Sequence, residues 1–101
     1  MGDPDRPDWE ETVITSSRFL RETKVSVTSV NTDASLLAYS KAIKIYNDGP
    51  AVVYREINDT ATTDSKPIHS RIAEGLDVDA TSVGLVCATG KTATVWVTEF
   101  G

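Results

Sequence analysis

Hydrophobic and polar residues alternate most regularly near the end of the chain, between residues 92 and 99. One face of this segment is small and apolar and the other is rich in threonine: Ala93, Val95 and Val97 against Thr94, Trp96 and Thr98. Only a pleated strand has this period of two, and β-branched and aromatic residues favour strands. The segment is therefore predicted to be a β-strand with one buried face.

Two β-hairpins are predicted from apolar runs separated by turn residues. The run 83–88 precedes the closing strand, and the Thr-Gly-Lys at 89–91 forms a three-residue loop between them. The strands 42–46 and 51–57 flank the Asn-Asp-Gly-Pro at 47–50, which is the strongest turn signal in the chain.

The remaining segments complete an all-β pattern. A strand is predicted at 25–30, ending near 31–33, and residues 36–39 are a short apolar run. A polar loop follows at 58–66 and an irregular stretch at 67–80. Six or seven short strands without a convincing helix predict a small antiparallel β-sandwich, Ig-like or jelly-roll-like, and no parallel sheet with a nucleotide crevice.

The first part of the chain differs from the rest. We expect residues 1–22 to be a flexible acidic arm and residues 23–101 to be the sandwich domain. The prolines and aspartates of residues 1–8 do not bury apolar surface. Between residues 9 and 22 both a helical stripe and an extended segment fit, and the strand-like Thr-Val-Ile-Thr at 12–15 favours an extended arm.

Charge is concentrated in this arm. The 101 residues carry a net charge of −5, of which residues 1–11 contribute −4 through five carboxylates and one arginine. Basic residues are scattered along the remainder, which disfavours binding to nucleic acid. No run approaches the about 18 apolar residues of a membrane span, and no secretory signal is visible, so a soluble cytosolic product without a membrane partner is expected.

Candidate catalytic groups are few. Cys87 lies in a strand-like run and is expected to be buried. The sole histidine, His69, is expected to lie at the surface or to have its hydrogen bonds satisfied. Metal-ligand spacings of Cys or His are absent, and the loop aspartates are expected to be solvated. Glu56 and Glu99 would suit glycoside hydrolysis only at a defined separation, which the sequence does not fix. We expect no cofactor, no metal and no enzymatic activity.

Aromatic residues are the remaining candidates for binding. Trp96, Tyr46 and Tyr54 suit a platform on which sugars stack. The favoured alternative is that Trp96 fills the core while Val95 points outward. In a third interpretation a neighbouring subunit covers Trp96.

From residue 25 to residue 100 the order of strands and turns forms a pattern without catalytic motifs. Its elements are an apolar strand leading into Asn-Asp-Gly at 47–49, Val-Val-Tyr at 52–54, the loop threonines Thr60, Thr62 and Thr63, Pro-Ile at 67–68, Ala73 and Gly75, the run 83–88, and the strand 92–97. This order resembles the small β-sandwich structural proteins of tailed bacteriophages, which include capsid decoration, head-fibre and neck or tail accessory subunits. The charged segment 68–74 departs from the pattern, and the arm lies outside it.

The resemblance implies a non-catalytic virion protein, made in the host cytoplasm, that decorates the capsid or serves as an accessory subunit. Its partners would be the major capsid protein or neighbouring structural subunits, and a homo-oligomer is expected because virion subunits associate symmetrically. The alternatives are a neck or tail accessory subunit and a carbohydrate-binding β-sandwich module. The expected partner contacts are Trp9, Val13, Ile14, Phe19, Leu20, Tyr46, Tyr54 and Trp96.

Overall fold

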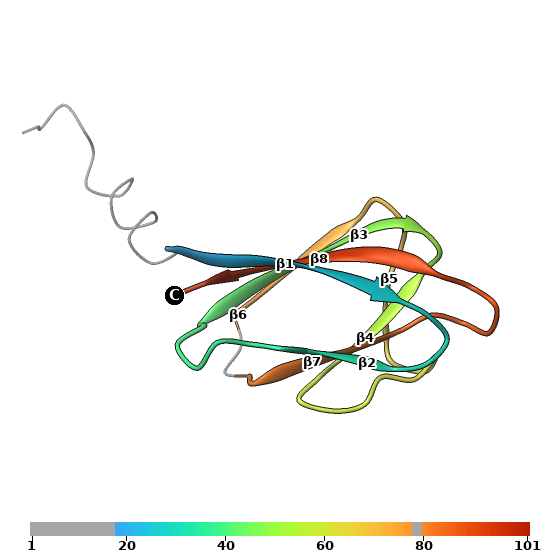
Figure 1. The fold of residues 1–101 in the computed structure, drawn as a ribbon, viewed down its shortest axis with the longest axis horizontal. Coiled ribbons are helices and arrows are strands. Elements are labelled where there is room, and N and C mark those ends of the chain that lie inside the picture. Colours follow the sequence, from blue (N-terminus) through green and yellow to red (C-terminus); the bar gives the residue numbers. More distant parts are fainter. Residues whose placement is uncertain (1–17, 78–79) are drawn as a thin grey trace, which may run out of the picture.

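The computed structural model describes residues 18–77 and 80–101, in which all regular structure is β-strand and no helix is present that could span a membrane. The strands are β1 (Phe19–Val27), β2 (Thr32–Ser35), β3 (Ala42–Pro50), β4 (Val53–Ile57), β5 (Lys66–Ile68), β6 (Ala73–Asp77), β7 (Ser82–Val86) and β8 (Ala93–Phe100). They form two four-stranded antiparallel sheets, ordered β1-β8-β3-β6 and β2-β7-β4-β5. The expected antiparallel β-sandwich is confirmed (Figure 1).

Strand pairing joins the two halves of the chain. β1 pairs with β8, β2 with β7, β3 with β6 and β4 with β5, as in one long hairpin whose tip is the β4–β5 loop. This hairpin is rolled up, so that successive strands lie in different sheets except β4 and β5 at its tip. Eight strands in this order form a jelly roll, whereas an Ig-like sandwich divides its strands differently. The structure therefore selects the jelly roll from the two expected architectures.

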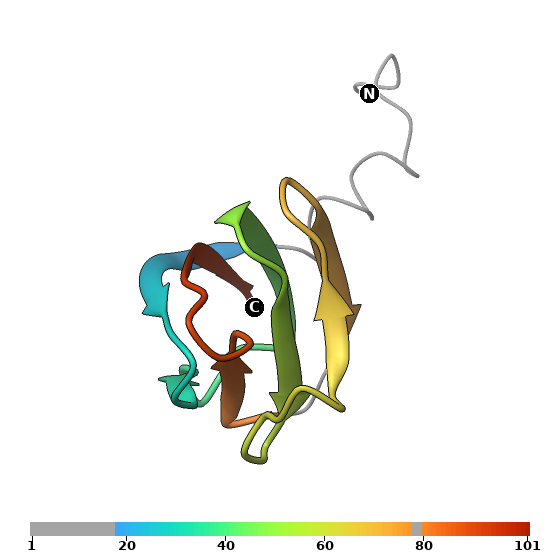
Figure 2. The same ribbon diagram turned by 90° about the vertical axis from the view of Figure 1, so that its right-hand side faces the viewer.

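Both predicted hairpins are wrong for the same reason. β7 and β8 lie in different sheets, as do β3 and β4, and the chain crosses between the sheets after each first strand (Figure 2). Of the seven connections between the eight strands, only the one from β4 to β5 stays within a sheet. A local turn signal shows where the chain reverses, but the sheet that the next strand joins depends on partners far away in the sequence.

The predicted turn at 47–50 is instead the end of β3. A β-bulge lies between Asn47 and Gly49, and Gly49 has a φ of 84°. Asn47 is fully buried, and its side-chain amide donates to the carbonyls of Ala51 and Ile68, both at 2.8 Å, while its oxygen accepts from the Gly49 N–H at 2.8 Å. This amide therefore fixes the bulge, the crossing to β4 and the end of β5.

Strand boundaries differ from the predictions in two other places. The segment 67–80 was predicted to be irregular, but β5 begins at its edge and β6 lies within it. β6 contains alanine, glycine and acidic residues, which have low strand propensity, and its pairing with β3 overrides that preference. The strand predicted at 25–30 begins earlier, at Phe19, so residues 19–22 belong to the sandwich rather than to the arm.

The end of the chain holds the start of β1 in place. The Arg18 N–H donates to the Gly101 carbonyl at 3.1 Å, and the Gly101 N–H donates to the Arg18 carbonyl at 2.7 Å. Residues 19–22 are extended, as predicted. The remainder of the proposed arm, including Trp9, Val13 and Ile14, lies outside the described residues.

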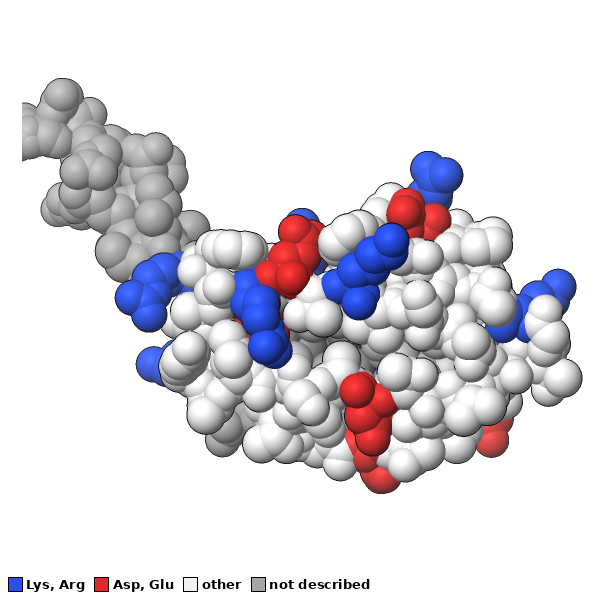
Figure 3. All heavy atoms as spheres, in the orientation of Figure 1, with Lys and Arg blue, Asp and Glu red and all other residues white. Residues whose placement is uncertain are grey.

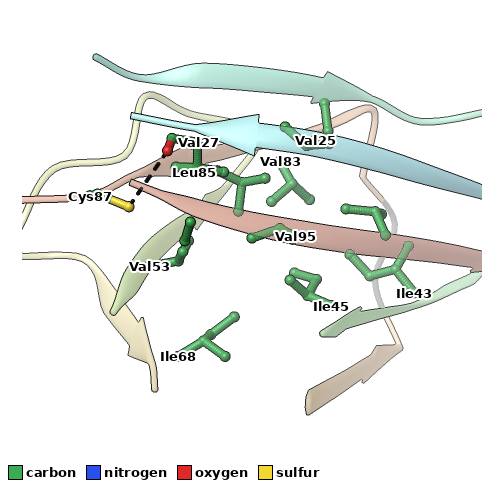
Figure 4. Close-up of a cluster of buried hydrophobic side chains, with 13 residues drawn as sticks. Val25, Val27, Ile43, Ile45, Val53, Ile68, Val83, Leu85, Cys87 and Val95 are labelled. Atoms are coloured by element: carbon green, nitrogen blue, oxygen red, sulfur yellow. Dashed lines mark hydrogen bonds between the residues drawn. The ribbon is translucent and has the colours of Figure 1, made fainter. Parts of the chain in front are cut away.

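The core lies between the sheets and consists mainly of β-branched residues (Figure 4). Its largest fully buried apolar side chains are Ile43, Ile45, Leu85, Val27, Val53, Val83, Val95 and Val97. Cys87 extends this cluster, and its thiol lies 3.9 Å from the Val27 carbonyl oxygen. Burial raises the pKa of the thiol, and the expected burial of Cys87 is confirmed.

The β4–β5 loop packs over the outer face of β7 at Gly84. A Cβ at Gly84 would lie 2.4 Å from the Asp59 carbonyl oxygen and 2.8 Å from the Asn31 side-chain oxygen. The same Asn31 oxygen accepts from the N–H of Ala61, whose side chain is buried. The loop thus covers part of one face of the sandwich, and the contact requires glycine in β7.

We predict that G84A lowers the free energy of unfolding by about 1–3 kcal/mol, because the added methyl group displaces backbone atoms. G75A is the matched control, since a Cβ at Gly75 meets nothing within 4 Å. Urea unfolding of the two variants measures the difference. Equal stability of G84A and the unmodified protein would contradict the packing of the loop on β7.

Candidate functional site

A row of aromatic and charged side chains crosses the outer face of the β1-β8-β3-β6 sheet. The strand register places Trp96 of β8 between Lys24 of β1 and Tyr46 of β3. Lys24 Nζ lies 5.8 Å from the centroid of the Trp96 ring, within the range of a cation–π interaction. Glu22 and Lys44 occupy the next row of the same face. We call these five residues the Trp96 cluster.

The Trp96 cluster borders a shallow hollow of about 310 Å³, lined by Glu22, Lys44, Tyr46 and Trp96. The two rings are half-buried, so each leaves part of its surface open. Lys44 also borders a second hollow of about 450 Å³, which extends the depression toward Phe100. An open aromatic surface with an ammonium and a carboxylate beside it suits a ligand that has both apolar and hydrogen-bonding groups.

The structure overturns the favoured interpretation that Trp96 fills the core. Val95 is completely buried between the sheets, and Trp96 lies on the opposite side of β8. Ala93 and Val97 share the inner face with Val95, and a shift of register by one residue would expose all three. The alternation of the whole strand therefore decides where the largest side chain lies.

Tyr54 is not part of the Trp96 cluster. It belongs to β4, in the other sheet, and borders a separate hollow of about 520 Å³ together with Pro50 and Lys91. Two of the three aromatic residues expected to form a platform are thus brought together, and the third lies in the other layer.

Two further predicted contact residues lie at the start of β1. Phe19 is 59% exposed and packs edge-on against Phe100, with the ring centroids 6.4 Å apart. Leu20 is half-buried beside Gly101. Tyr39 is 58% exposed and lies at the same end, with its carbonyl oxygen close to Gly101. This end of the sandwich therefore presents apolar surface next to the Trp96 cluster.

A buried carboxylate lies at the end of β8. Glu99 is 0% exposed and accepts hydrogen bonds from the Ser40 hydroxyl at 2.6 Å, the Leu37 N–H at 2.7 Å and Arg21 Nε at 2.7 Å. Arg21 also donates to the Ser35 carbonyl at 2.9 Å. Glu99 therefore attaches the β2–β3 connection to the ends of β1 and β8.

Burial pushes the pKa of Glu99 upward, but the hydrogen bonds from Ser40, Leu37 and Arg21 outweigh it and hold the pKa below its ordinary value. Glycoside hydrolysis would require Glu99 and Glu56 at a defined separation. Glu56 lies on β4 in the other sheet and accepts a hydrogen bond from Ser65 at 2.9 Å. The two carboxylates thus have separate structural partners.

A second ionic group joins the two sheets at their other edge. Arg55 of β4 donates two hydrogen bonds of 2.8 Å to Glu74 of β6, and Lys66 Nζ lies 3.4 Å from the same carboxylate. The hydrogen bond from Arg55 lowers the pKa of Glu74 despite partial burial. No sequence signal indicated this contact, because the partners belong to strands that the predicted hairpins did not bring together.

Other candidate groups remain apart. His69 is exposed in the β5–β6 connection, in agreement with the expected surface histidine. Within residues 18–77 and 80–101, no three side chains of His, Cys, Asp or Glu gather as metal ligands would.

No protein-family model, curated protein sequence or solved structure matches the chain. The fold and the site together define a jelly-roll β-sandwich with an open aromatic outer face. Its function is therefore inferred from the surface itself.

We predict that E99Q lowers the free energy of unfolding at neutral pH by about 1.5–3 kcal/mol, because hydrogen bonds to a charged acceptor are lost. The pKa of Glu99 is lowered in the folded state, so its contribution is present above the ordinary value of 4.5 and is lost as the pH falls through the folded value. The difference between E99Q and the unmodified protein should consequently narrow as the pH falls below 4.5.

Urea unfolding across a pH series measures this effect, with E22Q as the control because Glu22 is exposed. A pH-independent difference for E99Q would contradict the assigned role of the charge.

Proposed function

We propose that this protein is a non-catalytic virion structural subunit that binds neighbouring virion proteins, as a capsid decoration or accessory subunit. The observation that carries the proposal is the open Trp96 cluster on one outer face of a jelly roll. Jelly rolls serve as capsid and lectin domains, and both uses place binding on the surface of a packed sandwich.

The two outer faces of the sandwich are unequal, and their difference supports the proposal. The β4–β5 loop covers Gly84 on the β2-β7-β4-β5 sheet, where Ala61 is buried. The opposite sheet brings two half-buried aromatic residues, Trp96 and Tyr46, together at one hollow, whereas Tyr54 is the single aromatic residue that lines the hollow on the first sheet. Aromatic residues are enriched in protein interfaces and frequently dominate their binding energy.

The charges around the aromatic pair suit an interface. Lys24, Lys44 and Glu22 surround the rings on the same face. Protein interfaces commonly have such an apolar centre with a polar rim, which fixes the orientation of the partner. A neck or tail accessory subunit would use the same surface, and its location on the particle distinguishes it from a decoration subunit.

We predict that the purified protein cosediments with particles assembled from the major capsid protein of the same genome. W96A should weaken this binding about 30-fold or more, the effect expected when an interface hot spot is removed. Y54A is the matched control, because Tyr54 is a half-buried aromatic residue in the other sheet. Absence of binding to heads, necks and tails would refute the proposal.

The same hollow favours a second candidate, a carbohydrate-binding module. Trp96 and Tyr46 provide aromatic surface, and Glu22 and Lys44 provide an acceptor and a donor beside it. In a W9F variant Trp96 is the sole tryptophan, since the chain has two. Quenching of its fluorescence by an oligosaccharide would support this candidate, and no change across a broad glycan panel would exclude it.

A further inference from the structure

Four cations and one carboxylate, Glu22, lie along the open face, starting where the N-terminal segment joins the sandwich. β1 and β3 both run antiparallel to β8, so Arg18 before β1 and Lys41 before β3 lie at the same end. Lys44 and Lys24 follow on the outer face. Blue side chains are visible at this end of the molecule in Figure 3. Among the described residues, no carboxylate forms an ion pair with Lys24 or Lys44.

Apolar surface alternates with these cations. Phe100 and Ala42 lie opposite each other between Lys41 and Lys44. Trp96 and Tyr46 lie opposite each other on the far side of Lys44. The two hollows of this face meet at Lys44. We call this succession of cations and aromatic residues the basic strip. It suits an extended peptide that carries both carboxylates and large apolar side chains.

The chain itself contains a segment of that composition. Residues 18–77 and 80–101 include nine basic and nine acidic residues and are therefore neutral, whereas residues 1–17 carry −4 and Asp79 the remaining −1. The segment 1–17 also contains large apolar residues next to its acidic ones. Its charged and large apolar residues are Asp3, Asp5, Arg6, Asp8, Trp9, Glu10, Glu11, Val13 and Ile14.

The length of the segment bears on which copies it can reach. Arg18 exchanges two hydrogen bonds with Gly101, so the segment joins the sandwich at the end of the sheet where the basic strip begins. Seventeen residues span at most about 56–61 Å, enough to reach the same face of a neighbour.

We propose that residues 1–17 of one copy bind the basic strip of a second copy, so that exchanged arms hold a homo-oligomer together. Carboxylates of the arm lie against Lys44 and Lys24, and its apolar residues fill the two hollows. The inference rests on the proposed function, because it adds another copy of this chain to the neighbouring virion proteins that the Trp96 cluster contacts.

Sedimentation velocity of the full chain tests the proposal at low and high salt. We expect an oligomer at about 50 mM salt that dissociates at about 0.5 M, where the Debye length is short. K44E should raise the dissociation constant about fivefold or more, since it replaces attraction by repulsion. K91E is the matched control, because Lys91 is an exposed lysine on the β7–β8 connection.

Mixing two full-length variants identifies the occupant of the strip. K24E/K44E reverses the charge of two strip lysines and leaves the arm intact, whereas E10K/E11K brings the net charge of the arm from −4 to zero and leaves the strip intact. Each variant alone should be monomeric, and an equimolar mixture should form oligomers because the acidic arm of K24E/K44E then meets the unmodified strip of E10K/E11K.

Three outcomes would overturn the proposal. In the first, the unmodified protein is monomeric and E10K/E11K alters the fluorescence of Trp96 in a W9F background. This result would place the arm on its own sandwich. An oligomer whose mass is unaffected by either pair of substitutions would place the contact elsewhere. A monomer that still cosediments with capsids through Trp96 would refute arm exchange and leave the proposed function standing.

Discussion

The structure depends on the position of β8 between β1 and β3. The last strand of the chain forms hydrogen-bonded ladders on both sides, so the sheet is complete only when the end of the chain is in place. Its alternating residues supply three features at once. Val95 and Val97 fill the core, Glu99 accepts hydrogen bonds at its buried end, and Trp96 projects from the outer face.

Buried polar groups then fix the connections of the rolled hairpin. Six of the seven connections pass between the sheets, where no strand ladder satisfies the backbone. Asn47 and Glu99 supply hydrogen bonds at two such connections, and Arg55 with Glu74 joins the sheets directly. Among the described residues, no fully buried side-chain polar atom lacks a partner, as stability requires because an unsatisfied buried group is costly.

The asymmetry of the two outer faces connects this fold to binding. The β4–β5 loop shields part of one sheet, while the other presents aromatic rings beside lysines. The described sandwich is neutral, and the acidic charge lies in residues 1–17. A single chain thus contains both an open basic surface and a segment of opposite charge, and the proposed arm exchange rests on these two features.

Local pattern determined the strands with clear alternation and the burial of Cys87, because a period of two needs only neighbouring residues. Two of the three residues of the expected platform, Tyr46 and Trp96, also meet. Tertiary structure alone decided which strands pair, the outward position of Trp96, the buried network of Glu99 and the existence of β6. These features depend on contacts between distant segments, and such contacts leave no local periodicity in the sequence.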